Sequence, residues 1–301
     1  MNETAFLRAG LVGLGTMGRP MARNLRRAGF PLSLFNRTAA RAAALAAEDA
    51  GGGAVSVASS PSEVARASDV VVTCLPDSPE VEDVLFCPDG VASGAKEGTL
   101  VVDCSTIAPE AARSIAERMR ARGLGFVDAP VSGGEKGAID GTLTFFVGGE
   151  AADVERARPV FAALGKRVTH LGPSGSGQLG KAVNQVLVAC NLVAVSEGLA
   201  LAAKAGLPLD ALHEALTAGA ASSWALQVLG RKMIDRDFKP AFAIRHQQKD
   251  LAIVLKTARA SGVPLPGTAL AHQLLAALEA QGRGDDGTQA LFTLYEKLSG
   301  R

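Results

Sequence analysis

Aromatic side chains are scarce in this 301-residue chain, in which phenylalanine, tyrosine and tryptophan together make up 4% of the residues. Proteins that bind single-stranded nucleic acid stack bases on such side chains, so the composition argues against that role. The net charge is also small, at +1, which gives no general attraction to nucleic acid or to acidic membranes. We therefore expect neither nucleic acid nor a membrane among the partners.

Cysteine and histidine are also scarce, with four residues of each. The cysteines are far apart and form no Cys-x-x-Cys pair, which predicts reduced core side chains and neither disulfides nor a zinc site. The histidines show no metal-ligand spacing, so no metal is expected. The start of the chain lacks the basic residues and the unbroken apolar run of a secretory signal, which predicts a cytoplasmic protein.

Apolar residues make up 48% of the chain and charged residues 20%, which predicts a globular protein. Short apolar runs alternate with helical patterns up to about residue 170, an order typical of a doubly wound, mostly parallel α/β sheet. Strand signals then disappear, and a long apolar helix opens an all-helical half. We predict two domains, residues 1–171 and 172–301, joined through that helix. Strands are expected at 5–12, 32–35, 70–74, 100–103, 126–129 and 143–147, and helices at 16–28, 39–47, 109–122, 152–163, 178–205, 209–218, 224–233, 250–261, 269–280 and 289–298.

The long helix over about 178–205 is too apolar for an exposed surface helix. It is therefore expected to be buried in the second domain or in an interface between copies of the chain. We expect a homo-oligomer, either a dimer or a tetramer.

A glycine-rich turn follows the first apolar run and precedes a helical pattern. Gly13 allows the tight turn, Gly15 lets the backbone approach a pyrophosphate, and Gly18 lets the helix pack against the strand. The N–H groups of the first helical turn then face the phosphates, where the helix dipole favours negative charge. This context predicts a Rossmann dinucleotide site, the alternative being a glycine turn that is merely tight. The expected cofactor contacts here are Gly13, Leu14, Gly15, Thr16, Met17 and Gly18.

The end of the second expected strand distinguishes NAD from NADP. An NAD-binding unit usually carries Asp or Glu there to hold the ribose 2′-hydroxyl, whereas this chain has Asn36, Arg37 and Thr38. Arg37 can pair with a 2′-phosphate through its planar guanidinium, and its two neighbours can add neutral hydrogen bonds. We therefore expect NADP(H) in preference to NAD(H). The alternative is that Arg37 is a solvated surface residue.

A serine-glycine-glycine turn, Ser132-Gly133-Gly134, follows the apolar run that ends near residue 129. Backbone N–H groups exposed in such a turn, together with the Ser132 hydroxyl, suit a carboxylate. The alternative is an ordinary turn at the end of a strand.

Lys181 falls in the opening turn of the long helix, with Asn184 and Gln185 three and four positions further on, on the same face. An ammonium group near a helix N-terminus and among apolar residues has a lowered pKa. Such a lysine can protonate a carbonyl oxygen as hydride arrives at the carbon, and can take the proton back in the reverse reaction. The two amides can hold substrate oxygens. The alternative for Lys181 is a surface residue without a catalytic role.

Four motifs occur in order along the chain: the glycine turn with Met21-Ala22-x-Asn24-Leu25, Asp128-Ala129-Pro130-Val131-Ser132-Gly133-Gly134, Gly175-x-Gly177-x-x-x-Lys181-x-x-Asn184, and Lys249-Asp250-Leu251. Together they resemble the β-hydroxyacid dehydrogenases. That family contains 3-hydroxyisobutyrate dehydrogenase, tartronate semialdehyde reductase (2-hydroxy-3-oxopropionate reductase) and the glyoxylate/succinic semialdehyde reductases. The resemblance covers essentially the whole chain, and four ordered motifs are far more specific than any one of them.

The resemblance implies an oxidoreductase whose partner is a small carboxylate-bearing aldehyde or 3-hydroxy acid, and the end of the second expected strand adds the preference for NADP(H). It implies that Lys181 is the catalytic acid/base, and that Lys249 reaches the cofactor ribose and the substrate while Asp250 orients it. Substrate contacts are then assigned to Ser132, Gly133, Gly134, Asn184, Gln185, Lys249 and Asp250, and the nicotinamide side of the cofactor to Leu75, Pro76, Ser105 and Thr106. Those last four follow expected strands, where open α/β sheets bind ligands.

The stretch Glu135-Lys136-Gly137-Ala138 and the segments 219–223 and 246–250 look most like the tartronate semialdehyde reductases. Two positions depart from the family pattern. Gln185 stands where many relatives carry asparagine, and Trp224 lies near the position where those reductases carry arginine. The bulky indole of Trp224 would suit a more apolar semialdehyde. The alternatives are therefore 3-hydroxyisobutyrate dehydrogenase and succinic semialdehyde/glyoxylate reductase. A nucleotide-binding sensor without turnover is a further alternative, against which the presence of Lys181 argues.

Overall fold

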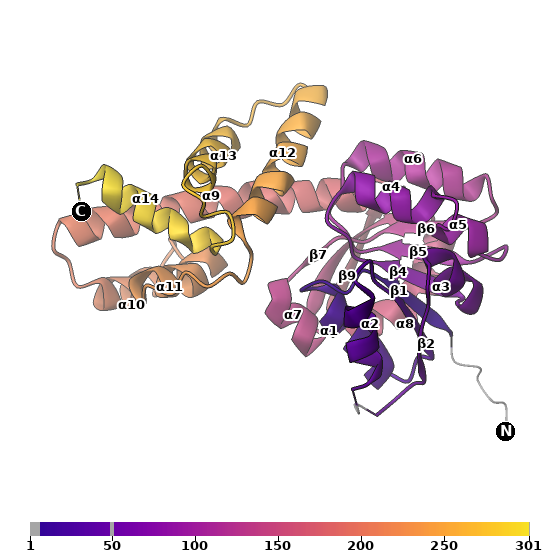
Figure 1. The fold of residues 1–301 in the computed structure, drawn as a ribbon. Helices are drawn as coiled ribbons and strands as arrows, with labels where there is room; N and C mark the ends of the chain where they lie inside the picture. Colours follow the sequence, from indigo (N-terminus) through magenta and orange to yellow (C-terminus); the bar gives the residue numbers. More distant parts are fainter. Residues whose placement is uncertain (1–6, 49–50, 301) are drawn as a thin grey trace. The chain divides into compact units, whose positions relative to one another are not determined.

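The first part of the chain contains one mixed β-sheet (Figure 1). The structure is a computed structural model that describes residues 7–48 and 51–300. Its strands are β1 (Ala9–Val12), β2 (Leu32–Phe35), β3 (Val55–Val57), β4 (Val70–Thr73), β5 (Leu100–Asp103), β6 (Gly125–Asp128), β7 (Val131–Ser132), β8 (Leu143–Gly149) and β9 (Gly165–Gly172). The order β3-β2-β1-β4-β5-β6 is parallel throughout, so the direction of winding reverses between β1 and β4. Ligands of such sheets bind outside the carboxyl ends of the strands, near that reversal. β8 then pairs antiparallel with β6 and β7 and parallel with β9.

Alternate residues of the strands face two apolar cores, one on each side of the sheet. Val70 and Val72 belong to one core, whereas Val71 between them belongs to the other. The first core is covered by α1, α2 and α8, and the second by α3, α4, α5 and α6. Burial on both sides explains why these strands give short continuous apolar runs in the sequence. The helices are α1 (Gly18–Arg27), α2 (Ala39–Ala46), α3 (Pro61–Ala67), α4 (Ser78–Phe86), α5 (Val91–Gly94), α6 (Pro109–Arg120), α7 (Gly134–Asp140) and α8 (Ala151–Leu164).

The expected strands are all present, although residues 5 and 6 of the first lie outside the described residues. The doubly wound domain predicted from their alternation with helices is confirmed. β3, β7 and β9 were not expected. The first two contain only three and two residues, and β9 is mostly exposed and rich in polar residues such as Lys166 and Arg167. None of the three therefore gives the apolar run on which the prediction depends.

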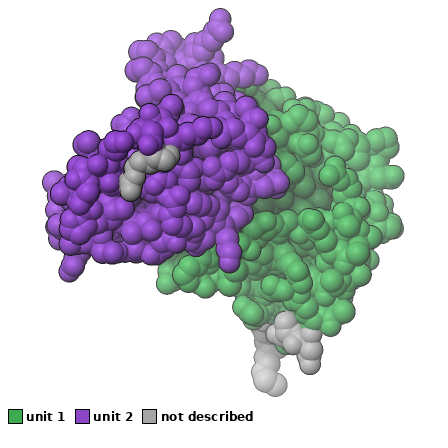
Figure 2. Space-filling model, turned by 60° about the vertical axis from the view of Figure 1, so that its left-hand side comes forward, with its two compact units in different colours: residues 1–181 green, residues 182–301 purple. Residues whose placement is uncertain are grey.

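The chain divides into two compact units at Lys181 and Ala182 (Figure 2), beyond the boundary predicted after residue 171. The division falls inside α9 (Ser176–Lys204). The first turn of α9 belongs to the first unit because it is hydrogen-bonded to the end of β6 and to the loop that follows β5.

The described part of the second unit is helical, as predicted, and residues such as Leu199, Met233 and Leu251 form its apolar core. The helix expected at 224–233 is instead a π-helix followed by the short α11, so this segment has one wide turn. By length and composition alone α9 could cross a membrane, a test that the core helix of a globular protein also passes. The remaining helices are α10 (Leu209–Ala218), the π-helix η1 (Ala225–Gly230), α11 (Arg231–Ile234), α12 (Ile244–Ala260), α13 (Pro266–Glu279), the 3-10 helix η2 (Thr288–Ala290) and α14 (Leu291–Leu298).

Candidate active site

The glycine turn between β1 and α1 is packed tightly at two of its glycines and open at the third. Gly13 has a φ of +100°, and a side chain there would clash with the carbonyl oxygen of Cys74. A side chain at Gly18 would clash with the carbonyl oxygen of Gly13. At Gly15, by contrast, a Cβ atom would meet no described atom within 4 Å. The turn therefore leaves free space at the glycine where the sequence predicts the approach of a pyrophosphate.

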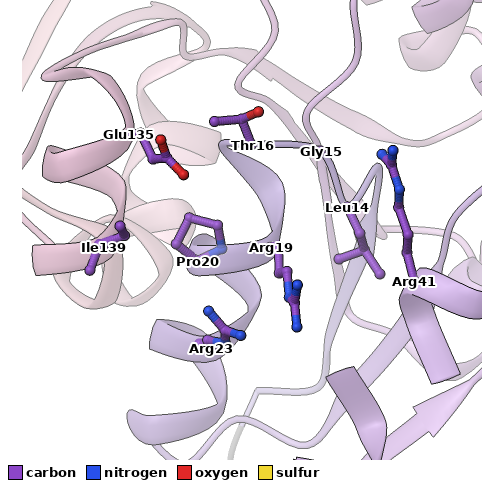
Figure 3. Close-up of a pocket in the computed structure, with 9 residues that line it drawn as sticks. All are labelled: Leu14, Gly15, Thr16, Arg19, Pro20, Arg23, Arg41, Glu135 and Ile139. Atoms are coloured by element: carbon purple, nitrogen blue, oxygen red, sulfur yellow. The ribbon is translucent and has the colours of Figure 1, made fainter. Parts of the chain in front are cut away.

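A pocket of about 390 Å³ lies beside this turn (Figure 3). The turn, α1, α2 and α7 contribute its lining, which consists of Leu14, Gly15, Thr16, Arg19, Pro20, Arg23, Arg41, Glu135 and Ile139. Three of these side chains are guanidinium groups and one is a carboxylate, so the lining suits an anion such as a dinucleotide phosphate. The open Gly15 backbone and the basic lining together fit a dinucleotide cofactor.

Glu48 neutralises part of that positive charge. Its carboxylate pairs with Arg19 and Arg23, each at 2.7 Å. The hydrogen bond from Arg23 is the main cause that lowers the pKa of Glu48 to about 2. Arg41, by contrast, has no ion pair with any described residue. Sequence reasoning missed Arg41, which lies in the first turn of α2, shortly after Arg37.

Of the three residues expected at the ribose, Asn36 is hydrogen-bonded within the protein, and Arg37 and Thr38 are exposed. The Asn36 carbonyl oxygen accepts a hydrogen bond from the backbone N–H of Leu14 at 2.8 Å, and its amide nitrogen donates to the Thr38 carbonyl at 3.0 Å. Asn36 therefore holds the glycine turn against the end of β2. The side chains of Arg37 and Thr38 are exposed beside it.

The loops after β4 and β5 are joined through Ser105. The backbone N–H of Leu75 donates to the Ser105 hydroxyl at 2.9 Å, and that hydroxyl donates to Asp103 at 2.6 Å. Asp103 also accepts a hydrogen bond from Thr73 at 2.7 Å. The structure thus brings together two of the residues expected on the nicotinamide side, Leu75 and Ser105. Pro76 is exposed and Thr106 is half-buried next to them.

Asp103, which sequence reasoning missed, is fully buried at the end of β5. Burial raises the pKa of its carboxyl to about 6, although Ser105 and Thr73 donate hydrogen bonds that lower it. Its second oxygen has no hydrogen-bond partner among the described residues. A charged residue at the end of the apolar run Leu-Val-Val-Asp was the signal available in the sequence.

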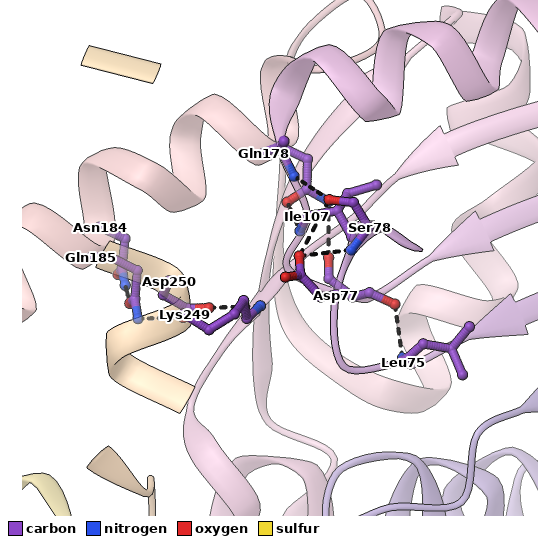
Figure 4. Close-up of polar contacts among 11 residues, drawn as sticks. Leu75, Asp77, Ser78, Ile107, Gln178, Asn184, Gln185, Lys249 and Asp250 are labelled. Carbon is purple, nitrogen blue, oxygen red and sulfur yellow. Dashed lines mark hydrogen bonds and ion pairs between the residues drawn. The ribbon is translucent and has the colours of Figure 1, made fainter. Parts of the chain in front are cut away.

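The first turn of α9 is attached to the carboxyl ends of two strands. The Asp128 carboxylate accepts hydrogen bonds from the backbone N–H groups of Gly175 at 2.8 Å and Gln178 at 2.9 Å. The Gln178 amide accepts from the N–H of Ile107 at 3.0 Å and donates to the carbonyl of Ser105 at 2.9 Å (Figure 4). Lys181 follows one turn later and is only 8% exposed.

In the second unit, four predicted site residues form one polar chain (Figure 4). Asn184 donates to the Gln185 side-chain oxygen at 2.8 Å, and Gln185 donates to Asp250 at 2.7 Å. Lys249 pairs with the other Asp250 oxygen at 2.9 Å. Both ends of the buried Gln185 amide are thus bonded within the protein. Gln185 therefore faces Asp250, whereas the sequence assigned it to the substrate.

The serine-glycine-glycine turn connects β7 to α7. Gly133 and Gly134 have φ angles of +131° and +61°, so the turn needs glycine at both positions. Asn24 of α1 holds α7 by a hydrogen bond of 2.7 Å from its amide to the Ala138 carbonyl. The turn and the half-buried Ser132 are therefore fixed with respect to α1 and the glycine turn.

The described residues contain no group of three His, Cys, Asp or Glu side chains that could hold a metal ion. None of the four cysteines, all of which are described, forms a disulfide, and Cys104 is buried. The candidate site residues described above supply backbone N–H groups, amides, hydroxyls, carboxylates, lysines and arginines.

Comparison with known proteins identifies the family. Residues 8–172 match the family described as the NAD binding domain of 6-phosphogluconate dehydrogenase, and residues 175–295 match the family described as NAD-binding of NADP-dependent 3-hydroxyisobutyrate dehydrogenase. The chain is 41% identical to the 2-hydroxy-3-oxopropionate reductase of Escherichia coli (strain K12), over 97% of this chain and 98% of that protein. It belongs to the β-hydroxyacid dehydrogenase family. The chain is therefore an NAD(P)-dependent oxidoreductase that acts on CH–OH groups.

Other relatives in this family carry different substrate names. The NAD-dependent L-serine dehydrogenase of Pseudomonas aeruginosa is 37% identical over the whole of both chains. The structure of Mycobacterium tuberculosis 3-hydroxyisobutyrate dehydrogenase with L-serine has a TM-score of 0.87 and 32% identity, covering 96% of this chain and 99% of that one. Small hydroxyacids are thus the substrate class of the family.

Proposed function

We propose that this β-hydroxyacid dehydrogenase is an NADP(H)-dependent reductase of a small 3-oxo acid or semialdehyde, with tartronate semialdehyde (2-hydroxy-3-oxopropionate) as its first candidate substrate. The observation that carries the proposal is Lys181, a buried lysine one turn into a helix that is attached to the carboxyl ends of β5 and β6. The 41% identity to an enzyme named for this reaction supports the choice of substrate.

The proposed chemistry needs a proton donor and a carboxylate site. NADPH, when bound, supplies the hydride for the aldehyde carbon. The Lys181 ammonium donates a proton to the carbonyl oxygen, so the aldehyde becomes a hydroxyl group and the lysine becomes a neutral amine. The N–H groups of Gly133 and Gly134 and the Ser132 hydroxyl hold the substrate carboxylate. Asn184 and Lys249 are proposed to hold the remaining substrate oxygens and the cofactor ribose.

The preference for NADP(H) is proposed from the end of β2. That strand ends without the carboxylate that would repel a 2′-phosphate, and Arg37 follows it. Arg41, in the lining of the pocket beside Leu14, adds a second guanidinium that has no carboxylate partner among the described residues. These two guanidinium groups favour the 2′-phosphorylated ribose of NADP(H) over the unphosphorylated ribose of NAD(H).

A panel of small aldehydes, assayed with NADPH and NADH side by side, tests the proposal. We expect the highest kcat/KM with tartronate semialdehyde and NADPH, and a loss of about 10²- to 10⁴-fold in kcat for Lys181→Ala. NADPH affinity should be nearly unchanged in that variant. Full activity of Lys181→Ala would remove this lysine from the mechanism, and NADPH binding without turnover of any aldehyde would favour a sensor.

A second candidate, 3-hydroxyisobutyrate dehydrogenase, is favoured by Trp224. Its indole is apolar and 61% exposed. The resemblance to the tartronate semialdehyde reductases places it near a position where arginine is expected. The same panel distinguishes the two, because a more apolar pocket would favour the methyl-bearing semialdehyde over the hydroxylated one. A Trp224→Arg variant should then shift the ratio of kcat/KM toward tartronate semialdehyde.

We also propose that the chain forms a homo-oligomer through α9. Leu179, Val183 and Leu187 repeat every four residues along this helix, and their exposed fractions are 49%, 57% and 60%. An uncharged apolar stripe of this kind can be covered by the same stripe of a second copy, since each copy presents it. Light scattering coupled to size exclusion should show at least a dimer, and Leu187→Lys should lower the measured mass. A monomeric wild-type protein would contradict this.

A further inference from the structure

We infer that Asp128 and Gln178 are positioning residues that fix the first turn of α9, and with it Lys181, against the end of β6 and the loop after β5. The inference rests on the proposed role of Lys181 as the proton donor. Neither Asp128 nor Gln178 is among the residues assigned to substrate or cofactor above.

Asp128 supplies the N-terminal cap that α9 lacks in its own sequence. The first N–H groups of an α-helix have no acceptor within the helix, and a negative charge stabilises that end. The first turn of α9 contains no acidic residue. Instead, the Asp128 carboxylate, which is fully buried, accepts from Gly175 and Gln178 across 47 and 50 positions of sequence. The cap therefore fixes the helix start to the end of β6.

Gln178 adds a second attachment. Its side chain is 2% exposed, and its amide pairs with the backbone at Ile107 and Ser105, on either side of Thr106. A planar amide bonded at both ends fixes the helix in direction as well as in distance. Because the Ser105 hydroxyl also accepts from Leu75, this attachment continues to the loop after β4.

The first turn of α9 is in close backbone contact with the sheet. A Cβ atom at Gly177 would clash with backbone oxygens of Asp128 and Phe146. One at Gly148 would clash with the Asp128 carboxylate. The backbone of the first turn of α9 thus lies directly on the sheet, so its position depends on this close contact together with the Asp128 and Gln178 hydrogen bonds.

Lys181 is three residues after Gln178, so both side chains project from the same face of α9. The face that carries Gln178 is turned toward the loop after β5, and Lys181 is buried on it. Proton transfer requires the amine within hydrogen-bond reach of the substrate oxygen. A small displacement of the first turn should therefore lower kcat even in a variant that still folds.

Asp128→Asn and Gln178→Met test the inference. Asp128→Asn keeps one acceptor oxygen and loses the negative charge. Gln178→Met keeps the size of the side chain and loses its hydrogen bonds to Ile107 and Ser105. We expect kcat to fall about 10- to 100-fold in each, with the NADPH dissociation constant nearly unchanged. Ser68→Ala is the matched control, because it removes a buried hydrogen bond of 2.7 Å to Val64 at the opposite end of β4. It should lower the melting temperature and leave kcat at the wild-type value.

A double-mutant cycle separates positioning from a merely structural role. In a Lys181→Ala background, Asp128→Asn and Gln178→Met should cause no further fall in kcat, because the group that they position is gone. Equal fold-losses in both backgrounds, or wild-type kcat in both single variants, would overturn the inference. If neither variant folds, the pair serves folding and the inference is wrong. Full activity of Lys181→Ala would instead overturn the proposed function.

Discussion

Gln185 donates a hydrogen bond of 2.7 Å from its side-chain nitrogen to the Asp250 carboxylate, and this contact joins α9 to α12. Both side chains are buried, at 2% and 3% exposure. Because Asp250 also pairs with Lys249, the length of the Gln185 side chain sets where that ion pair lies. An asparagine here is one methylene shorter and would not reach the same carboxylate oxygen.

Gln185→Asn should therefore weaken substrate binding. We expect KM for the aldehyde to rise about tenfold and the unfolding free energy to fall by about 1–3 kcal/mol, since a buried hydrogen bond is lost. Steady-state kinetics and urea unfolding measure the two effects. Gln281→Asn, the same change at an exposed glutamine of the second unit, is the control and should alter neither. An unchanged KM in Gln185→Asn would mean that the position of Lys249 does not depend on this contact.

The cofactor preference should depend on Arg37 and Arg41 together. If each guanidinium pairs with a 2′-phosphate, Arg37→Ala and Arg41→Ala should each lower the ratio of kcat/KM for NADPH over NADH about 10- to 100-fold. Activity with NADH should change little, because that cofactor lacks the phosphate. Arg66→Ala, at an exposed position in α3, should leave the ratio unchanged. A variant that kept the wild-type ratio would show that its arginine is a surface residue without a role in cofactor choice.

Asp103 should make stability depend on pH. Burial raises the pKa of its carboxyl from the ordinary value of 3.8 to about 6. The folded protein then binds this proton more tightly than the unfolded chain does. The protonated carboxyl therefore stabilises the folded protein fully below about pH 4, and this stabilisation is lost as the pH rises through 6. A rise of about two pKa units corresponds to about 3 kcal/mol. Asp128, whose pKa burial also raises to about 6, acts in the same direction.

The measurement is urea unfolding of Asp103→Asn and the wild type between pH 4 and pH 7. The neutral amide cannot lose a proton, so the variant should gain stability relative to the wild type, by about 2 kcal/mol, as the pH rises across this range. Asp89→Asn makes the same change at an exposed site and should give a curve parallel to that of the wild type. Parallel curves for Asp103→Asn as well would show that Asp103 ionises in the folded protein at its ordinary pKa.

The parts of the site that the sequence predicted are local. Gly13, Gly15 and Gly18 fall within six residues, and their turn, open position and close packing follow from backbone sterics. Lys181 could be placed near the start of the long helix because a glycine-rich segment directly before it marks where that helix begins. The contacts that hold α9 could not be predicted, because they join residues far apart in the chain, such as Gln178 and Ser105 across 73 positions. Local patterns carry no information about which strand end a distant helix will meet.

A comparison of Gly15→Ala with Gly18→Ala should separate cofactor binding from folding. A Cβ atom at Gly15 meets open space, so Gly15→Ala should melt close to the wild-type temperature. Its NADPH dissociation constant should rise at least about tenfold, because the methyl group occupies the expected position of the pyrophosphate. At Gly18 the same methyl group clashes with the Gly13 carbonyl, so Gly18→Ala should lose about 1–3 kcal/mol of stability. Gly198→Ala, in α9 and also in open space, controls for the substitution itself and should retain NADPH affinity. Calorimetric melting and NADPH titration give both readouts, and unchanged NADPH affinity in Gly15→Ala would place the pyrophosphate away from this turn.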